Sequence, residues 1–201
     1  GRTSGVAMTM LGTGLSGAQL YADVLSVQEA QLSMMQRIGS SEHNLLVTQG
    51  NLAINYEAQG RLDETLRLKQ DVYSRRVKLN GAEHEQTLIA ANNYAAILLK
   101  LNGLAEARSL LRNIMPVAGR IFGESADITL KMRWNYAKAL LRDADATLDD
   151  LLEAGTTLED TARTTRRVLG GAHPLTLAIL GDLRDSRAAL RARETPSPGS
   201  A

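Results

Sequence analysis

An asparagine recurs at a fixed interval along this chain of 201 residues. Asn51, Asn93 and Asn135 are 42 residues apart, and Asp182 follows the last of them after 47 residues. A carboxamide can donate a hydrogen bond to a peptide carbonyl and accept one from a peptide N–H, so this column could hold the backbone of an extended peptide. In the alternative interpretation each Asn has a structural role, in which it caps a local polar site or bonds an adjacent helix.

Basic side chains and the single tryptophan accompany the later part of this column. They are Lys100, Lys131, Lys138, Arg142 and Trp134. The cations could bind an acidic group or a C-terminal carboxylate, and the tryptophan could anchor an interface. Alternatively, the basic side chains keep an exposed face soluble and the tryptophan packs in the core. The corresponding earlier positions are apolar: Val47, Ile54, Ile89 and Ala96.

Residues that commonly perform catalysis or bind metals are poorly placed. The three histidines, His43, His84 and His173, are about 40 or more residues apart, and the chain has no Cys. A calcium loop starting at Asp143 would have leucine where glycine is needed and alanine where a bidentate glutamate is needed. The sequence also lacks a phosphate-binding glycine loop. We therefore predict a noncatalytic protein with no metal site and no cofactor, and we assign His84 and His173 to structural turns.

Composition restricts the classes of partner and compartment. The formal net charge is +1, which favours neither nucleic acid nor an anionic membrane, and no apolar stretch approaches the length of a membrane span. We expect the partner to be a protein or peptide, alone or within a larger complex. The absence of cysteine fits a reducing compartment, either the cytoplasm or the interior of an organelle, although many exported proteins also lack cysteine.

Apolar residues follow helical spacing throughout the central part of the chain, as in Leu88, Ala91, Ala95 and Leu98. Breaks, all but one of which contain glycine, divide this part into eight predicted helices. Their approximate ranges are 18–38, 43–59, 62–79, 84–101, 104–121, 126–143, 149–168 and 174–193. An irregular leader is expected at 1–17 and a flexible tail at 194–201.

The helices repeat as pairs with a period of 42 residues. Leu46, Leu88 and Leu130 keep this period, whereas Leu177 follows Leu130 after 47 residues. The five extra residues are predicted to lie between 141 and 151, as an enlarged turn inside the third pair. Because one pair cannot bury its apolar face alone, neighbouring pairs must stack.

Three of these pairs resemble tetratricopeptide repeats. The resemblance rests on the segments NLAINYEAQGRLDET, NNYAAILLKLNGLAEA and WNYAKALL, which place large, small and turn-forming residues at the expected intervals. The 42-residue period and the connector at 171–177 are similar to the kinesin light chain type. HEAT and armadillo repeats have a similar period but do not show this series. The resemblance implies an all-α, right-handed superhelical solenoid of antiparallel helix pairs over 18–193, with about three and a half pairs plus an N-terminal helix.

The same resemblance implies a function. In this family the Asn column faces a concave groove, so the implied module binds a partner segment there without catalysis. The implied groove residues are Asn51, Asn93, Asn135, Trp134, Lys100, Lys131, Lys138 and Arg142. The alternative is a structural subunit, held in a larger assembly through its outer surface, ends and tails. An enzyme or an RNA binder is a third and weaker interpretation.

The last copy departs from the family pattern. Arg184 stands at the small-residue position and Arg187 at the aromatic position. Burying an unpaired guanidinium would be very costly, so this face of the final helix is predicted to meet solvent. The helix is therefore expected to cap the array.

Overall fold

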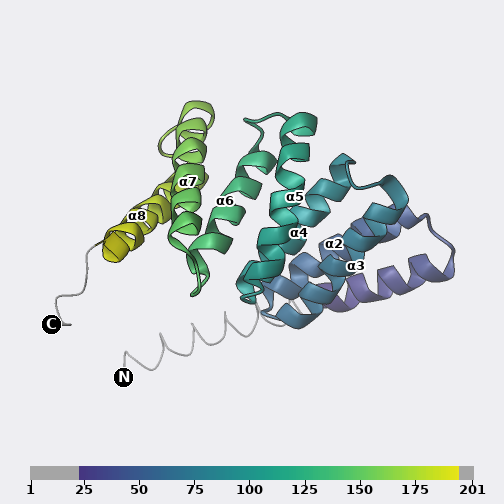
Figure 1. Ribbon diagram of the computed structural model, residues 1–201. Helices are drawn as coiled ribbons and strands as arrows, with labels where there is room; N and C mark the ends of the chain where they lie inside the picture. The colour runs from purple at the N-terminus through teal and green to yellow at the C-terminus, as the bar shows by residue number, and fades with distance from the viewer. Residues whose placement is uncertain (1–22, 195–201) are drawn as a thin grey trace, which may run out of the picture. The chain divides into compact units, whose positions relative to one another are not determined.

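The computed structural model describes residues 23–194, and every regular element within that range is a helix. This confirms the predicted all-α class. Residues 23–37 form a helix. The predicted leader, residues 18–22 of the first predicted helix and residues 195–201 of the predicted tail lie outside the described range. The other helices, drawn in Figure 1, are α2 (Glu42–Ala58), α3 (Leu62–Asn80), α4 (Glu85–Lys100), α5 (Leu104–Phe122), α6 (Asp127–Arg142), α7 (Leu148–Val168) and α8 (Pro174–Glu194).

The chain divides into two compact units between Arg75 and Arg76, within α3. In the first unit, polar contacts join the helices. The Arg75 guanidinium donates two hydrogen bonds to the Glu42 carboxylate, at 2.6 and 2.7 Å. Tyr56 donates to Glu29 at 2.5 Å, which joins α2 to the helix at 23–37.

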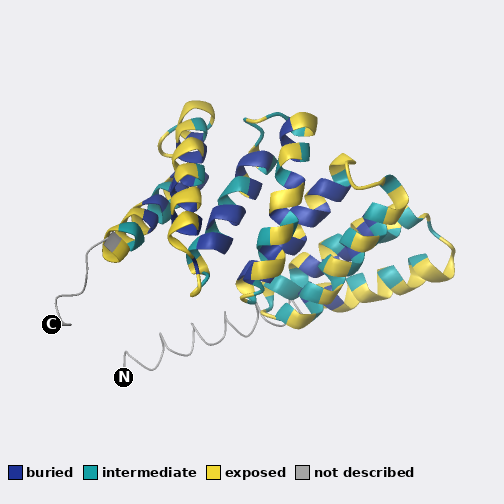
Figure 2. Ribbon diagram, viewed as in Figure 1, coloured by how far each residue is buried: buried dark blue, intermediate teal, exposed yellow. Residues whose placement is uncertain are grey.

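In the second unit the helices pack as a repeat. Each helix from α4 to α7 packs on the next one, and the first helices of successive pairs also contact each other, α4 with α6 and α6 with α8. Figure 2 shows buried residues along the helices of this unit. Ala95 and Ala137, which are equivalent, are both 0% exposed. At the equivalent position of α8, Arg184 is exposed, as is Arg187, which confirms the prediction that this face meets solvent.

The five-residue insertion is divided between a turn and a helix. Three residues separate α4 from α5, whereas five, 143–147, separate α6 from α7. In repeat register, α7 also begins three residues earlier than α5. Thr147 and Asp150 form a capping box at this extended start, and hydrogen bonds from Thr147 lower the pKa of the Asp150 carboxyl.

Two connector histidines begin helices. Nδ1 of His84 accepts from the backbone N–H of Gln86 at 3.1 Å, and Nδ1 of His173 accepts from Leu175 at 3.2 Å. The structural role predicted for both is confirmed. Ala126 occupies the equivalent position before α6 and makes no side-chain cap.

Substituting Ala126→Ser should therefore stabilise the protein. A serine hydroxyl at this position can accept a backbone hydrogen bond of α6, which should raise the free energy of unfolding by about 1 kcal/mol. Thermal unfolding followed by circular dichroism would measure the change. Ala126→Val is the control because valine cannot accept that bond, and an equal stabilisation by both substitutions would contradict the capping explanation.

Candidate functional site

The predicted groove residues lie on the first helices of successive pairs. Asn51 is on α2 in the first unit and is exposed. In the second unit, α4 carries two of the predicted residues and α6 carries the other five. α4 contacts α6, and α6 contacts α8, so the predicted residues of α4 and α6 lie on neighbouring helices. These residues are Asn93, Lys100, Lys131, Trp134, Asn135, Lys138 and Arg142.

The asparagine column is not uniform. Asn93 is exposed. Asn135 is only 6% exposed, and its Nδ2 donates to Oδ1 of Asn92 at 3.1 Å. Asn92 is equally buried, so the two carboxamides form a hydrogen bond between α4 and α6. Asn135 therefore has the structural role that the sequence left open, while Asn93 presents its side chain to solvent.

Trp134 links α6 to the next first helix. Its Nε1 donates to Oδ2 of Asp182 on α8 at 2.5 Å. The ring is half-buried, and Nζ of Lys138 lies 3.8 Å from its centroid, within the range of a cation–π contact. The tryptophan is therefore neither a core residue nor a fully exposed anchor, and part of its surface remains available.

These two contacts are the same contact, repeated. Asn92 and Trp134 are equivalent positions, and so are Asn135 and Asp182. In each case a residue on one first helix bonds the residue one place further along on the next first helix. The sequence signal was present as separations of 43 and 48 residues, each one more than the local repeat length. A comparison restricted to residues at the same repeat position does not reveal this contact, because the two partners occupy adjacent positions.

Three predicted cations lie close enough to affect one another. Burial lowers the pKa of the Lys138 amine, the positive charges of Arg142 and Lys100 lower it further, and Asp182 opposes the shift. Arg142 also donates to the Leu99 carbonyl at 3.4 Å. An anionic group beside these three cations would be favoured because it relieves their repulsion.

Lys131 differs from these cations because it has a nearby carboxylate of its own. Its Nζ lies 2.6 Å from Oδ2 of Asp127, one turn earlier on α6, and both side chains are about half exposed. An exposed pair of this kind is weak, so Lys131 can exchange this partner for another at low cost.

A second repeated contact, also missed from sequence, joins α4 to α5 and α6 to α7. Tyr94 donates to Glu106 at 2.5 Å, and Tyr136 donates to Glu153 at 2.7 Å. Arg112 on the preceding second helix donates to the Tyr136 hydroxyl at 2.7 Å. Tyr94 and Glu106 are 12 residues apart, and Tyr136 and Glu153 are 17 apart, a difference equal to the five inserted residues. The two pairs could therefore have been found by comparing Tyr–Glu separations before and after the insertion.

Neither a metal site nor a membrane span is found in the described part of the chain. No group of three or more His, Asp or Glu side chains among residues 23–194 is arranged to hold a metal ion. Among the described helices, none combines the length and the apolar character needed to cross a membrane.

The candidate binding surface lies where α4, α6 and α8 are neighbours, because an aromatic ring and several cations are close together there.

Comparisons with known proteins identify the repeat. A sequence model of the tetratricopeptide repeat family matches residues 44–113. A solved structure of a kinesin light chain-like protein from Podosopora anserina, with nearly identical TPR-like repeats, is similar to this chain with a TM-score of 0.69 and 22% identity. The match covers 87% of this chain and 81% of that one.

Two further solved structures are similar. A variant of the Podosopora anserina protein has a TM-score of 0.71, also at 22% identity, over 87% of this chain and 80% of that one. BtubC (BKLC) from P. vanneervenii has a TM-score of 0.56 and 15% identity, over 90% of this chain and 78% of that one. No curated protein matches the sequence.

Tetratricopeptide repeats generally mediate protein–protein interactions and are generally not catalytic. The family match lies within α2 to α5, and the structural similarity extends over most of the remaining helices. The repeated Ala, Leu and Tyr positions of α4 and α6 are those on which the sequence resemblance rested. Residues 44–113 therefore match the tetratricopeptide repeat family, and the fold of the chain is that of the kinesin light chain-like solved structures.

Proposed function

We propose that this protein is a noncatalytic interaction module, and that a segment of a partner protein binds along the neighbouring first helices α4, α6 and α8. The observation that carries the proposal is the combination at Trp134. A half-buried aromatic ring, a cation against its face and two further cations nearby can together recognise a segment with an apolar and an acidic residue.

Asn93 supports the same proposal. Its carboxamide is exposed on α4, and α4 contacts α6. One carboxamide can both donate to and accept from the backbone of a bound segment, whatever its sequence. Asn93 would therefore contribute affinity, whereas Trp134, Lys138 and Arg142 would contribute preference for particular side chains.

Removing the Asn93 carboxamide should weaken partner binding without affecting the fold. Asn93→Ala should reduce retention of the partner about fivefold, equivalent to about 1 kcal/mol for one or two lost hydrogen bonds. Its melting temperature should not change, because the side chain is exposed. The measurement is quantitative mass spectrometry of proteins retained by immobilised wild-type and variant chains.

Asn113→Ala is the matched control, because Asn113 is also an exposed asparagine but lies on the second helix α5. It should retain the same proteins as the wild type. If Asn93→Ala retains them equally well, Asn93 does not contact the partner. Cross-linking of the native complex then tests the wider proposal. Cross-links confined to α5 and α7 would favour the alternative of a structural subunit that is held through its outer surface.

A further inference from the structure

The outer side of α8 is exposed, whereas the equivalent sides of the preceding first helices, α4 and α6, are covered by a second helix. α4 packs on its second helix α5, and α6 packs on α7. Leu130 of α6 is 0% exposed, whereas Leu177, its equivalent on α8, is 56% exposed. In the described part of the chain, α7 is the only second helix that packs on α8. The surface that would meet a further second helix is therefore bare of any helix described within residues 23–194.

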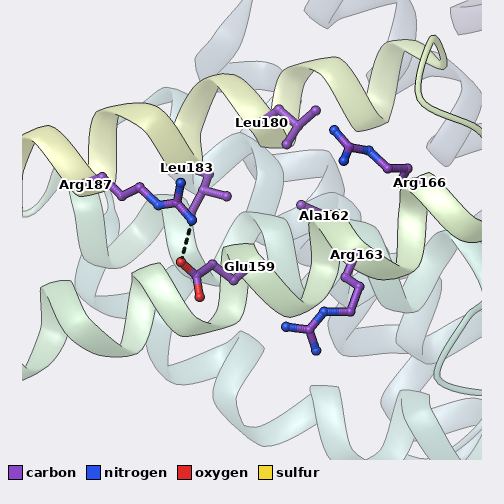
Figure 3. A pocket seen from close by; sticks show the side chains of 7 residues that line it. All are labelled: Glu159, Ala162, Arg163, Arg166, Leu180, Leu183 and Arg187. Atoms are coloured by element: carbon purple, nitrogen blue, oxygen red, sulfur yellow. Dashed lines mark hydrogen bonds and ion pairs between the residues drawn. The ribbon is translucent and has the colours of Figure 1, made fainter.

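A pocket of about 470 Å³ lies on this side, between α7 and α8. Figure 3 shows the side chains that line it. Leu180 and Leu183 of α8 provide an apolar part. The charged part consists of Glu159, Arg163, Arg166 and Arg187.

The preceding repeat indicates what kind of element could bind at this pocket. Arg163 and Pro116 are 47 residues apart and so occupy equivalent positions in successive repeats, as do Leu180 and Arg133. Pro116 and Arg133 both line a pocket whose remaining wall includes Thr157 and Asp160 of α7. In the preceding repeat, therefore, α7 lies against the surface of α5 and α6 that is equivalent to this pocket.

The charges on the bare surface determine which helix would suit it. Arg187 is paired with Glu159 at 2.7 Å, and Arg163 with Asp160 at 3.3 Å. Among the described residues, neither Arg166 nor Arg184 has an ion-pair partner, and both are exposed. A helix that packs here must bring carboxylates to these guanidinium groups and apolar side chains to the leucines.

We propose that the surface formed by Arg163, Arg166, Leu177, Leu180, Arg184 and Arg187, the α7–α8 end face, binds an acidic amphipathic helix of a partner protein. Two copies of this face would place arginines against arginines, which disfavours self-pairing. Residues 195–201, TPSPGSA, contain no carboxylate side chain and two prolines, so this segment does not have the required chemistry. The exposed leucine favours a protein helix over a nucleic acid.

The test uses the full chain and a designed probe. The probe is a fluorescein-labelled peptide of 21 residues, the length of α8, with Leu at helical spacing and Glu on both flanks. A second probe carries Lys in place of every Glu. Fluorescence anisotropy should show saturable binding of the Glu peptide, weakened by salt, and at least about tenfold weaker binding of the Lys peptide.

Charge reversal on the end face should abolish this preference. Arg166→Glu with Arg184→Glu should weaken binding of the Glu peptide at least about tenfold. Arg166→Ala with Arg184→Ala introduces no new charge and should give a smaller loss. Arg167→Glu with Arg193→Glu is the matched control, since it makes the same change in charge at exposed arginines outside the pocket and should retain most of the wild-type affinity.

Two results would overturn the proposal. One is undiminished binding of the Glu peptide by both end-face double variants. The other is tighter binding of a single-stranded oligonucleotide than of the Glu peptide, with the same dependence on Arg166 and Arg184. Asn93→Ala should leave peptide binding unchanged, which separates this surface from the one on α4 and α6. Circular dichroism of every variant verifies that the helices are retained.

Discussion

Replacing Ala137 by arginine is expected to lower the free energy of unfolding of the second unit by about 4 kcal/mol, enough to unfold a marginally stable domain. Ala137 is 0% exposed, in the interior of that unit. The larger side chain would overpack the core, and burial of its charge would add a desolvation penalty. These two penalties act together, which makes this one of the two largest effects that we expect from a single substitution.

Urea unfolding, followed by Trp134 fluorescence, measures this change. Trp134 suits the purpose because it is the only tryptophan and bonds Asp182 of α8. Arg184→Ala is the matched control at the equivalent position of the next repeat, where the side chain is exposed. It should change stability by less than about 0.5 kcal/mol. Comparable losses for the two substitutions would show that burial does not distinguish these positions.

The second large effect is expected for Leu130→Ala. Leu130 is 0% exposed on α6, so truncation removes buried methyl groups and leaves a cavity. Such substitutions cost about 2–5 kcal/mol. The same urea titration would record the change as a lower midpoint with a similar slope, because the same surface becomes exposed on unfolding.

Leu177→Ala provides the comparison for Leu130→Ala. The two leucines occupy the same repeat position, but Leu177 is 56% exposed, so its truncation should cost less than about 1 kcal/mol. A loss at Leu177 as large as that at Leu130 would mean that something covers the end of α8 in solution. That result would bear directly on the α7–α8 end face.

The helices could be predicted closely because local signals mark both of their ends. Observed and predicted limits of α2 to α8 agree within one residue. Glycine with positive φ follows several helices, at Gly60, Gly81, Gly123 and Gly170. These are short-range properties of the backbone, so they are visible in the sequence without knowledge of the packing. The position of the insertion was equally accessible, because it follows from counting residues between equivalent positions.

The role of each groove residue was less predictable, because equivalence in sequence does not ensure an equivalent environment. Asn93 and Asn135 occupy the same position, yet one is exposed and the other is buried against Asn92. The burial of Asn135 depends on a residue of the neighbouring first helix, because Asn92 of α4 accepts its hydrogen bond.

The basic residues illustrate a second limit. Sequence placed Lys131 with Lys138 and Arg142, but their surroundings differ. Lys131 has Asp127 beside it, whereas the pKa of Lys138 is lowered by burial and by neighbouring cations. Burial and nearby charge are properties of the packed helices, and the repeat pattern does not encode them.

The divided insertion before α7 has a consequence for protein engineering. Tyr136 still meets Glu153 at 2.7 Å although five more residues separate them than separate Tyr94 from Glu106. The hairpin that joins α6 to α7 thus changes length while the contact across it is preserved. Ala144 and Asp145 are exposed in this hairpin, so an epitope or a dye-labelled cassette grafted between them should leave α6 and α7 folded and report on this protein in a cell.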